Sequence, residues 1–270
     1  MSDFPDKRGY ALVTGAGVRI GAVIARKLAE GGWPVVIHTN HSQAEAAALA
    51  SALRFDGYKA MVVQGDLVNP RIISDIFDQA ADFGFCSLLV NSASRFAYDS
   101  MPGLSAESLD QMYAVNLRAP LLLTQQLAER LPEEARGLVI NILDQKVFNL
   151  NPDFFSYTVM KCALEAATRL AAQALAPRVR VCGIAPGLSL PSSSQTPKGF
   201  ADAHAETPLG FGSTPQDIAE AVSFIVKMAP MTGSTITVDG GQSLHGRPRD
   251  VMFSHEHDVL GGDGDKKISR

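Results

Sequence analysis

A glycine-rich turn near the N-terminus constrains the fold of this chain more than any other stretch. The apolar run Tyr10–Thr14 leads directly into three closely spaced glycines, Gly15, Gly17 and Gly21. A helix is expected from Ile20 to Glu30, because apolar residues recur there on one face. Strand, glycine turn and helix in this order favour a pyrophosphate site, since backbone amides and the helix N-terminus face the anion. An ordinary strand-to-helix turn, which often needs one glycine, is the alternative.

The rest of the chain alternates strand-like and helix-like segments. Strands are expected at 34–38, 60–65, 87–90, 137–143, 179–184 and 234–238, and helices at 43–55, 69–83, 106–130, 155–176 and from 214 onward. Alternation of this kind predicts an α/β fold with a parallel sheet. Pro120 marks a kink or break in the fourth helical segment. Neither a repeat nor an interdomain linker is evident, so the 270 residues are expected to form one large domain.

Composition excludes several classes of function. A hydrophobic content of 46% is ample for a buried core, and a net charge of −4 gives no basic footprint for nucleic acid. The three cysteines lack metal-ligand spacing and fit a reducing cytoplasm. The N-terminus is too polar for a signal peptide, and no apolar run reaches the roughly 18 residues of a membrane helix. We therefore expect a cytoplasmic protein without a membrane span, a nucleic-acid partner or a metal.

Residues 144–161 carry the candidate chemistry. Tyr157 and Lys161 are four residues apart, so on the expected helix both reach the same small volume. An ammonium beside a phenol stabilises the phenolate and lowers its pKa, which suits proton transfer at neutral pH. Asp144 ends a hydrophobic run, where open α/β sheets keep their chemistry. Taken alone, the Tyr–Lys spacing also arises by chance, as a surface tyrosine with an unrelated lysine.

The end of the second strand predicts which dinucleotide binds. Residues 34–44 contain no acid that could bond the ribose 2′-hydroxyl of NAD. Arg19, from the glycine turn, can reach the same region, and donors together with a cation suit a 2′-phosphate, so NADPH is favoured. Plain surface polarity is the alternative interpretation of His38 and His41. The donors offered here are Asn40, His41 and Ser42.

Polar, small and aromatic residues follow the third and fourth strands. A carboxylate after the third strand can meet an adenine amino group, and small residues after the fourth let the backbone approach a cofactor. A large aromatic just beyond them can form a pocket wall. Asn116, amid apolar neighbours, either binds a water or caps a turn. The strand-end residues are Asp66, Leu67, Asn91, Ser92, Ala93, Ser94 and Phe96.

The C-terminal third contains the expected lid and tail. Pro186 and Gly187 open a segment rich in Ser, Pro and Gly that is expected to lack regular structure and to cover a substrate pocket, at about residues 188–213. From His245 the chain is charged and glycine-rich, which suggests a tail that is partly ordered or docked on a neighbouring subunit. The predicted organisation is an N-terminal tail at 1–9, a domain at 10–244 and a C-terminal tail at 245–270.

These motifs, in this order, resemble the short-chain dehydrogenase/reductase family over residues 10–241. The resemblance implies a Rossmann fold with a doubly wound seven-stranded parallel sheet, and usually a homotetramer, in which Arg247 could approach a neighbour's pocket. It implies catalytic roles for Asn116, Tyr157, Lys161 and the residue at 144. Its implied cofactor contacts are Gly15, Gly17, Arg19, Ile20, Gly21, the 40–42 segment, Asp66, Leu67, Asn91, Ser92, Ala93, Tyr157, Lys161, Pro186 and Gly187.

Two departures from the usual family pattern point to one branch. Arg19 stands where the family turn usually has glycine, and Asp144 stands where it usually has serine. Both departures occur together in the pteridine reductase branch, which includes bacterial dihydromonapterin reductases. Phe96 matches the residue that stacks the pterin against the nicotinamide in that branch. His41 stands where an arginine is common there, which implies weaker affinity for the 2′-phosphate.

The acid at position 144 suits a C=N bond better than a ketone. An ionised Asp144 is acceptor-only and would repel a growing alkoxide, but it can accept bonds from pterin N–H groups. It would also disfavour ionisation of Tyr157, partly opposing Lys161 and keeping a proton available for donation. The alternative is that Asp144 points away and a neighbour such as Gln145 takes its place.

The resemblance therefore implies NADPH-dependent reduction of a dihydropterin to its tetrahydro form, with dihydromonapterin, dihydrobiopterin or dihydrofolate-like compounds as substrates. A carbonyl reductase of 3-oxoacyl thioesters or other ketones is one alternative, and a catalytically silent NADP-binding regulator is another. Retention of Tyr157, Lys161 and Asn116 together argues against silence. The residues expected to face the substrate are Arg19, Ser94, Phe96, Asp144, Tyr157 and Leu188.

Overall fold

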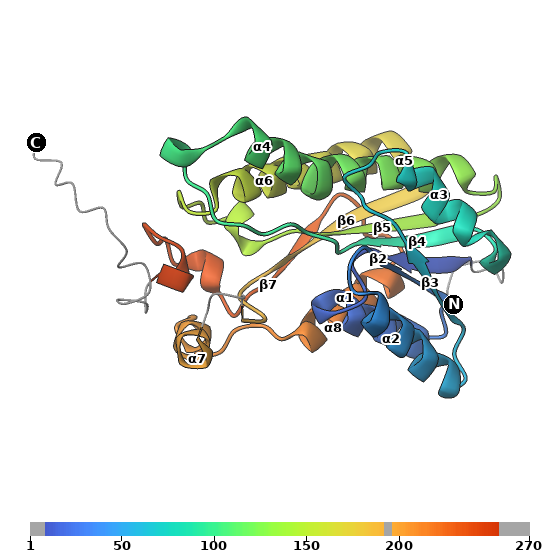
Figure 1. Cartoon of the computed structure of the whole chain (residues 1–270), viewed down its shortest axis with the longest axis horizontal. Coiled ribbons are helices and arrows are strands. Elements are labelled where there is room, and N and C mark those ends of the chain that lie inside the picture. Colours follow the sequence, from blue (N-terminus) through green and yellow to red (C-terminus); the bar gives the residue numbers. More distant parts are fainter. Residues whose placement is uncertain (1–8, 192–195, 254–270) are drawn as a thin grey trace, which may run out of the picture.

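The structure, a computed structural model, describes residues 9–191 and 196–253 and has three layers, with helices on both faces of a sheet (Figure 1). The sheet contains seven parallel strands in the order β3-β2-β1-β4-β5-β6-β7. Their bounds are β1 Tyr10–Val13, β2 Val35–Thr39, β3 Ala60–Gln64, β4 Cys86–Asn91, β5 Gly137–Ile142, β6 Val179–Pro186 and β7 Thr235–Val238. The predicted doubly wound, seven-stranded parallel sheet is confirmed.

The helices form two layers that bury opposite faces of the strands. Ala11 and Val13 of β1 pack into one core and Tyr10 and Leu12 into the other, because alternate residues of a strand point to opposite faces. On one face lie α1 Arg19–Glu30, α2 Gln43–Phe55 and α8 Pro215–Lys227. On the other lie α3 Ile72–Gln79, α4 Ala106–Tyr113, α5 Ala119–Arg130 and α6 Phe155–Leu175. Strand order reverses between β1 and β4, which creates the crevice where such sheets bind ligands.

The helical segment 106–130 is interrupted just before Pro120. The helices α4 and α5 are joined by a π-helical turn, Ala114–Arg118. Pro120 follows this turn directly, at the second residue of α5, and without an N–H it cannot bond to a carbonyl of the preceding turn. The irregularity expected at Pro120 is therefore a π-helical turn in a continuous helical segment, and it contains Asn116; such turns are frequent at functional sites.

The segment between β6 and α8 is more regular than expected. It contains α7, Pro197–Ala205, which the expectation of an irregular lid missed. Thr196 caps this helix by accepting a hydrogen bond from the Gly199 amide at 3.0 Å, as Thr214 caps α8. Both α7 and α8 begin with a Thr-Pro pair. This signal predicted α8 but was overlooked at α7, because a glycine in the first turn of α7 and the Ser- and Pro-rich residues before it suggested a loop. Residues 192–195 of the expected lid lie outside the described residues.

The beginning of the predicted C-terminal tail packs on its own domain. A short 3-10 turn, Val251–Phe253, buries Val251 and Met252. Arg247 pairs with Glu206 of the same chain at 2.6 Å, and its approach to a neighbour's pocket stays a prediction. Residues 1–8 and 254–270, which hold the remaining predicted tail segments, lie outside the described residues.

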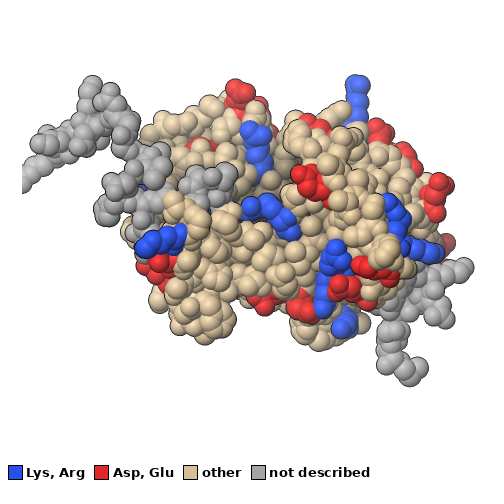
Figure 2. Space-filling model, turned by 60° about the horizontal axis from the view of Figure 1, so that its bottom comes forward, with Lys and Arg blue, Asp and Glu red and all other residues tan. Residues whose placement is uncertain are grey.

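The surface carries charges of both signs. Figure 2 shows Lys and Arg interspersed with Asp and Glu on the face in view, without a continuous basic stripe among its described residues. Within the ranges 9–191 and 196–253, helices fall short of the combined length and apolarity needed to cross a bilayer.

Candidate active site

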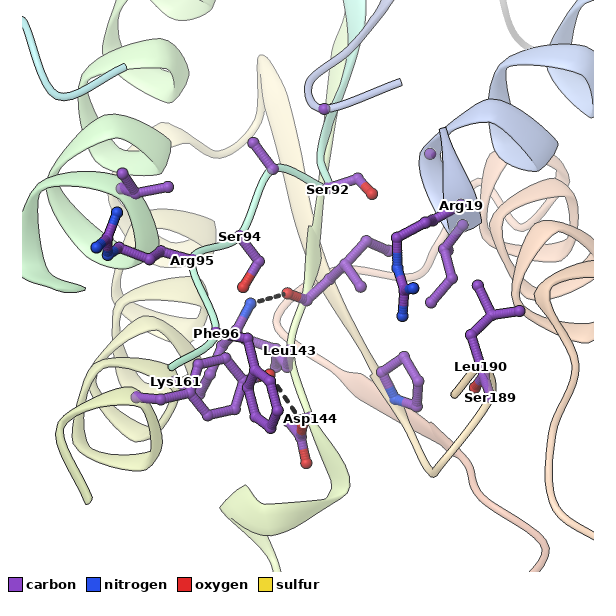
Figure 3. Close-up of a pocket in the computed structure, with 18 of the residues that line it drawn as sticks. Arg19, Ser92, Ser94, Arg95, Phe96, Leu143, Asp144, Lys161, Ser189 and Leu190 are labelled. Atoms are coloured by element: carbon purple, nitrogen blue, oxygen red, sulfur yellow. Dashed lines mark hydrogen bonds between the residues drawn. The ribbon is translucent and has the colours of Figure 1, made fainter. Parts of the chain in front are cut away.

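A cavity of about 600 Å³ opens at the carboxyl ends of the strands, where strand order reverses. Its wall comes from the glycine turn, the ends of β2 to β6, the start of α6 and the C-terminal turn at residues 249–253. This volume lies within the range of small-molecule and cofactor sites. Figure 3 shows Arg19 on one side of the cavity and Phe96, Asp144 and Lys161 on the other. We call these two sides the cofactor end and the substrate end.

The glycine turn at the cofactor end has no space for side chains. A Cβ at Gly15 would lie 2.8 Å from the Ala93 Cα, and Gly15 also has φ +64°. A Cβ at Gly17 would lie 2.8 Å from the Ser42 carbonyl oxygen. Glycine at both positions therefore allows the turn to approach the ends of β2 and β4, leaving its backbone amides close to the cavity.

Arg19 begins α1 in an unusual conformation. Its φ of 57° lies in the left-handed region that favours glycine, and holding another residue there costs about 1–3 kcal/mol. The Arg19 side chain extends towards the loop after β6 (Figure 3), and its Nη1 donates to the Pro191 carbonyl at 3.2 Å. The side chain thereby places a cation in the cavity beside the loop after β6.

His38 supports the glycine turn from inside the protein, so its interpretation as surface polarity is wrong. The ring is 1% exposed; Nδ1 accepts from the Gly15 amide at 3.3 Å and Nε2 lies 3.0 Å from the Gly65 carbonyl. These partners need one protonated and one free nitrogen, hence a neutral ring. Burial lowers the pKa of His38 to about 4. His41 is exposed and contacts the Asn40 side chain at 3.1 Å.

Thr14 and Asn91 organise the end of β4. Thr14 Oγ1 accepts from the amides of Ser92 and Ala93, both at 3.0 Å, and so bends this segment against the glycine turn. Asn91 is buried and does not line the cavity; its side chain donates to Asn141 Oδ1 at 2.8 Å. Thr14, whose side chain no sequence pattern singles out, contributes to the cofactor end through the backbone that it holds.

Asn116 is a positioning residue in this structure and does not line the cavity. Its Oδ1 accepts from Ser94 Oγ at 3.0 Å and from the Arg95 amide at 2.9 Å, and its Nδ2 donates to the Arg95 carbonyl at 2.8 Å. These bonds go to the Ser94 side chain and the Arg95 backbone, and the alternative of a bound water stays a prediction. Asn116 fixes the segment that carries Ser94 and Phe96.

A carboxylate and a phenol meet at the substrate end. The Tyr157 hydroxyl donates to Asp144 Oδ2 at 2.8 Å, and Asp144 Oδ1 accepts from the Lys146 amide at 2.9 Å. Asp144 therefore does not point away from the site, in contrast to the alternative that gave its place to Gln145. Gln145 is buried beside it, with a side-chain oxygen that has no hydrogen-bond partner within the described part of the chain.

Burial affects the pKa values of Asp144 and Tyr157 more than the charge of Lys161 does. It raises the pKa of Asp144 and, together with the Asp144 charge, raises that of Tyr157 well above its usual range. It lowers the pKa of Lys161 to about 8. The Lys161 ammonium donates to the Ile142 carbonyl at 2.8 Å and lies 5.6 Å from the centre of the Tyr157 ring. The expected lowering of the tyrosine pKa is wrong here, whereas Asp144 does disfavour its ionisation.

Asp99 positions the helix that carries Tyr157. Phe154, just before α6, has φ 53° and offers no capping side chain. Asp99, 57 residues away in sequence, accepts from the Ser156 amide at 3.0 Å and from the Ser156 hydroxyl. A carboxylate at a helix N-terminus satisfies free amides and opposes the helix dipole. Only the absence of a local cap in the sequence hints at such a partner.

Phe96 forms an aromatic wall that has its own support. Its ring stacks on Phe154, with centroids 4.2 Å apart and planes 19° apart, and it meets the Tyr157 ring edgewise at 4.8 Å. The side chain remains 45% exposed and lines the cavity. A flat ligand could therefore contact Phe96 next to the Tyr157–Asp144 pair.

The structure brings most of the predicted site residues around one cavity. Asn91 and Asn116 are the exceptions, because both lie behind the wall. Several lining residues were not selected from sequence, and they include residues of the β5 end and of the C-terminal turn. The unselected residues include Val18, His38, Thr39, Val68, Lys146, Ser189, Leu190, Gln242, Asp250, Val251 and Met252.

Comparisons with known proteins agree with this architecture. A family model described as enoyl-(acyl carrier protein) reductase matches residues 15–243. Pteridine reductase 1 of Leishmania tarentolae is 32% identical over 277 residues, covering 87% of this chain and 96% of that protein. An uncharacterised oxidoreductase of Methylorubrum extorquens is 33% identical over 241 residues, covering 86% and 96%. The crystal structure of FolM alternative dihydrofolate reductase 1 from Brucella canis, complexed with NADP, has a TM-score of 0.86 and 42% identity, covering 89% of this chain and 96% of that one. The Brucella suis structure, also in complex with NADP, gives the same TM-score and identity.

Proposed function

Because the chain belongs to the short-chain dehydrogenase/reductase family, we propose that it reduces a dihydropterin to the tetrahydropterin with NADPH. The observation that carries this proposal is the 2.8 Å hydrogen bond from the Tyr157 hydroxyl to Asp144 at the substrate end. Pteridine reductase 1 and the two FolM structures are the related proteins whose names support a pterin-type substrate.

The residues of the cofactor end fit NADPH. Gly15 and Gly17 bring the turn close to the ends of β2 and β4, where backbone amides can hold a pyrophosphate. The β2 end carries Asn40 and Ser42 without an acid, and Arg19 adds a cation that suits a 2′-phosphate. The NADP in both FolM structures supports the same choice. When bound, NADPH supplies the hydride.

Tyr157 and Asp144 have different roles at the substrate. Tyr157 keeps its proton, because burial and the Asp144 charge raise its pKa, and it donates that proton to the ring nitrogen of the C=N bond. Asp144, when ionised, accepts hydrogen bonds from N–H groups at the edge of the pterin. Phe96 offers a stacking surface beside them. Lys161 holds the end of β5 through the Ile142 carbonyl.

A panel of NADPH-oxidation assays tests the proposal. Dihydromonapterin, dihydrobiopterin and dihydrofolate are compared with 3-oxoacyl thioesters and simple ketones, using wild type and Tyr157→Phe. We expect turnover with dihydropterins that the variant loses. Turnover with ketones alone would identify a carbonyl reductase, and NADPH binding without any turnover would identify a silent regulator.

The preferred pterin side chain, the cytoplasmic location and a homotetramer remain predictions. The same assay panel ranks the pterins. Light scattering at micromolar concentration tests the assembly, and a monomer would contradict the tetramer. Arg247 already pairs with Glu206 in its own chain, so its approach to a neighbouring pocket would require exchange of that partner.

A further inference from the structure

A buried ion pair joins the loop after β5 to the C-terminal turn, residues 249–253. Lys146 Nζ lies 2.5 Å from Asp250 Oδ2, and the two side chains are only 3% and 10% exposed. The same ammonium donates to Asn151 Oδ1 at 2.9 Å and lies 5.6 Å from the centre of the Phe154 ring. Buried charges need close partners of this kind, because removal of one leaves the other without water or a counter-charge.

A second set of contacts holds the turn on either side of that pair. Asp153, which is 3% exposed, accepts from Arg249 Nε and from the Asp250 amide, both at 2.7 Å. The Phe253 ring lies 6.0 Å from the Phe154 ring with planes 18° apart. The turn is thus attached to the segment immediately before α6, the helix of Tyr157.

Between these attachments the turn faces the cavity. Val251 and Met252 are each 7% exposed and line the cavity, as Asp250 does. The Met252 amide donates to Asp250 Oδ1 at 2.9 Å, so one carboxylate holds both Lys146 and the backbone of the turn. Lys146 also lies two residues after Asp144, whose Oδ1 accepts from the Lys146 amide.

We infer that the C-terminal turn is the outer wall of the substrate end, and that the Lys146–Asp250 pair positions it against Asp144. Val251 and Met252 then limit the size of the substrate side chain. The pair is a positioning device whose two charges both act on Asp144. The inference rests on the proposed function for its substrate and on the contacts above for its geometry.

Because Lys146 and Asp250 carry opposite charges, removing one or the other should shift the pKa of Asp144 in opposite directions. Lys146 favours the ionised form of Asp144 and Asp250 disfavours it. The other ionisable groups near Asp144 come from α6: Tyr157, Lys161 and Cys162. Lys146→Met should therefore raise the pKa of Asp144 and Asp250→Asn should lower it. A merely structural lesion would move both variants in the same direction.

The test measures kcat/KM for a dihydropterin against pH, which reports ionisations of the free enzyme. We expect the limb that belongs to Asp144 to move to higher pH in Lys146→Met and to lower pH in Asp250→Asn. The double variant Lys146→Met/Asp250→Asn should return close to the wild-type profile. Asp56→Asn, which breaks the exposed Arg26–Asp56 pair, is the matched control and should leave the profile unchanged. Shifts of both single variants in one direction, or no shift in either, would overturn the inference.

Further measurements test whether the C-terminal turn forms the outer wall of the substrate end. Met252→Ala should lower KM for pterins with bulky side chains at least threefold relative to the smallest pterin, and an unchanged ratio would count against the wall. Hydrogen exchange of the full chain should accelerate at residues 249–253 in Asp250→Asn and not in Asp56→Asn. If wild type reduces no dihydropterin, the proposed function fails, while hydrogen exchange still decides the positioning role. The double variant covers the case in which Lys146→Met does not fold, because it leaves no unpaired buried charge.

Discussion

The two ends of the cavity are built in different ways. At the cofactor end, Gly15, Gly17 and Thr14 act through backbone placed directly at strand ends. At the substrate end, side chains from distant segments hold one another: Asp99 holds the start of α6, and Lys146 holds Asp250. The first end depends on the close approach of main chains, and the second on buried charges.

This difference separates two kinds of sensitivity. Backbone amides keep their direction whatever the pH, so the shape of the glycine turn should tolerate changes of charge but not added volume. Buried carboxylates and ammonium groups depend on one another, so the substrate end should respond to a single lost charge.

Tyr157→Phe should produce the largest effect. It removes the proton donor, and general acid catalysis typically contributes roughly 10²–10⁴-fold, so turnover of a dihydropterin should fall by that factor. Binding of NADPH, measured by fluorescence titration, should change far less, because the ring and its packing remain. An equal loss of NADPH affinity would show that the two ends are not separable at Tyr157.

His38 makes the stability of the cofactor end depend on pH. Its pKa in the folded protein is about 4, below the ordinary value of 6.5, so the unfolded chain binds the proton first. The stability that the neutral ring contributes is full above pH 6.5 and is lost as pH falls towards 4. At about 1.4 kcal/mol per pKa unit, this amounts to about 3 kcal/mol of unfolding free energy.

Urea unfolding at pH 7 and at pH 4.5 measures that loss. His38→Asn should flatten the dependence in this interval, since an amide does not titrate there. His41→Asn is the control on the exposed side of the same strand end and should keep the slope of wild type. An unchanged slope in His38→Asn would contradict the buried, neutral histidine.

Asp144→Ser tests the choice of substrate. It exchanges an acceptor for a hydroxyl and removes charge-assisted bonds worth about 1.5–3 kcal/mol each, so dihydropterin reduction should fall roughly a hundredfold. A slight gain on ketones is expected, because the hydroxyl can donate to a growing alkoxide. If dihydropterin turnover stayed intact, the acid would be incidental and the pterin proposal would lose its main physical support.

Arg19→Ala tests the choice of cofactor, as Asp144→Ser tests the choice of substrate. Loss of one charge-assisted contact should weaken NADPH binding about ten- to a hundredfold, while NADH binding should change much less. Titration of both dinucleotides measures the ratio. Equal losses would mean that Arg19 does not read the 2′-phosphate. The left-handed φ of Arg19 adds a second expectation: Arg19→Gly should lose the affinity without losing stability.

The fold and the cofactor end were largely predictable from the sequence. The glycine turn, the strand ends and the alternation of elements are local patterns, and the sheet and the family that they predicted are confirmed. His38 was misread, because a polar residue at a strand end gives no sign of the carbonyl from another strand that buries it.

The substrate end was predictable only in part. Asp144 and Tyr157 were identified through their place relative to a strand and a helix, and the structure joins them at 2.8 Å. Asp99 and Asp250 were missed, because each acts on a segment far away in sequence. The Thr-Pro start of α7 was present in the sequence but was outweighed by Ser, Pro and Gly around it.

Phe96→Ala should give the smallest effect and the finest view of the substrate end. Aromatic stacking contributes about 0.5–1.5 kcal/mol beyond buried area, so KM for a dihydropterin should rise about two- to tenfold with little change in kcat. Phe55→Ala is the control, since Phe55 is 92% exposed and does not line the cavity. Phe154 stacks on Phe96, so Phe154→Leu should raise KM by a smaller factor without touching the pterin. If Phe96→Ala instead lowered kcat and left KM unchanged, Phe96 would serve to orient Tyr157, which it meets edgewise, and the pterin would not stack on it.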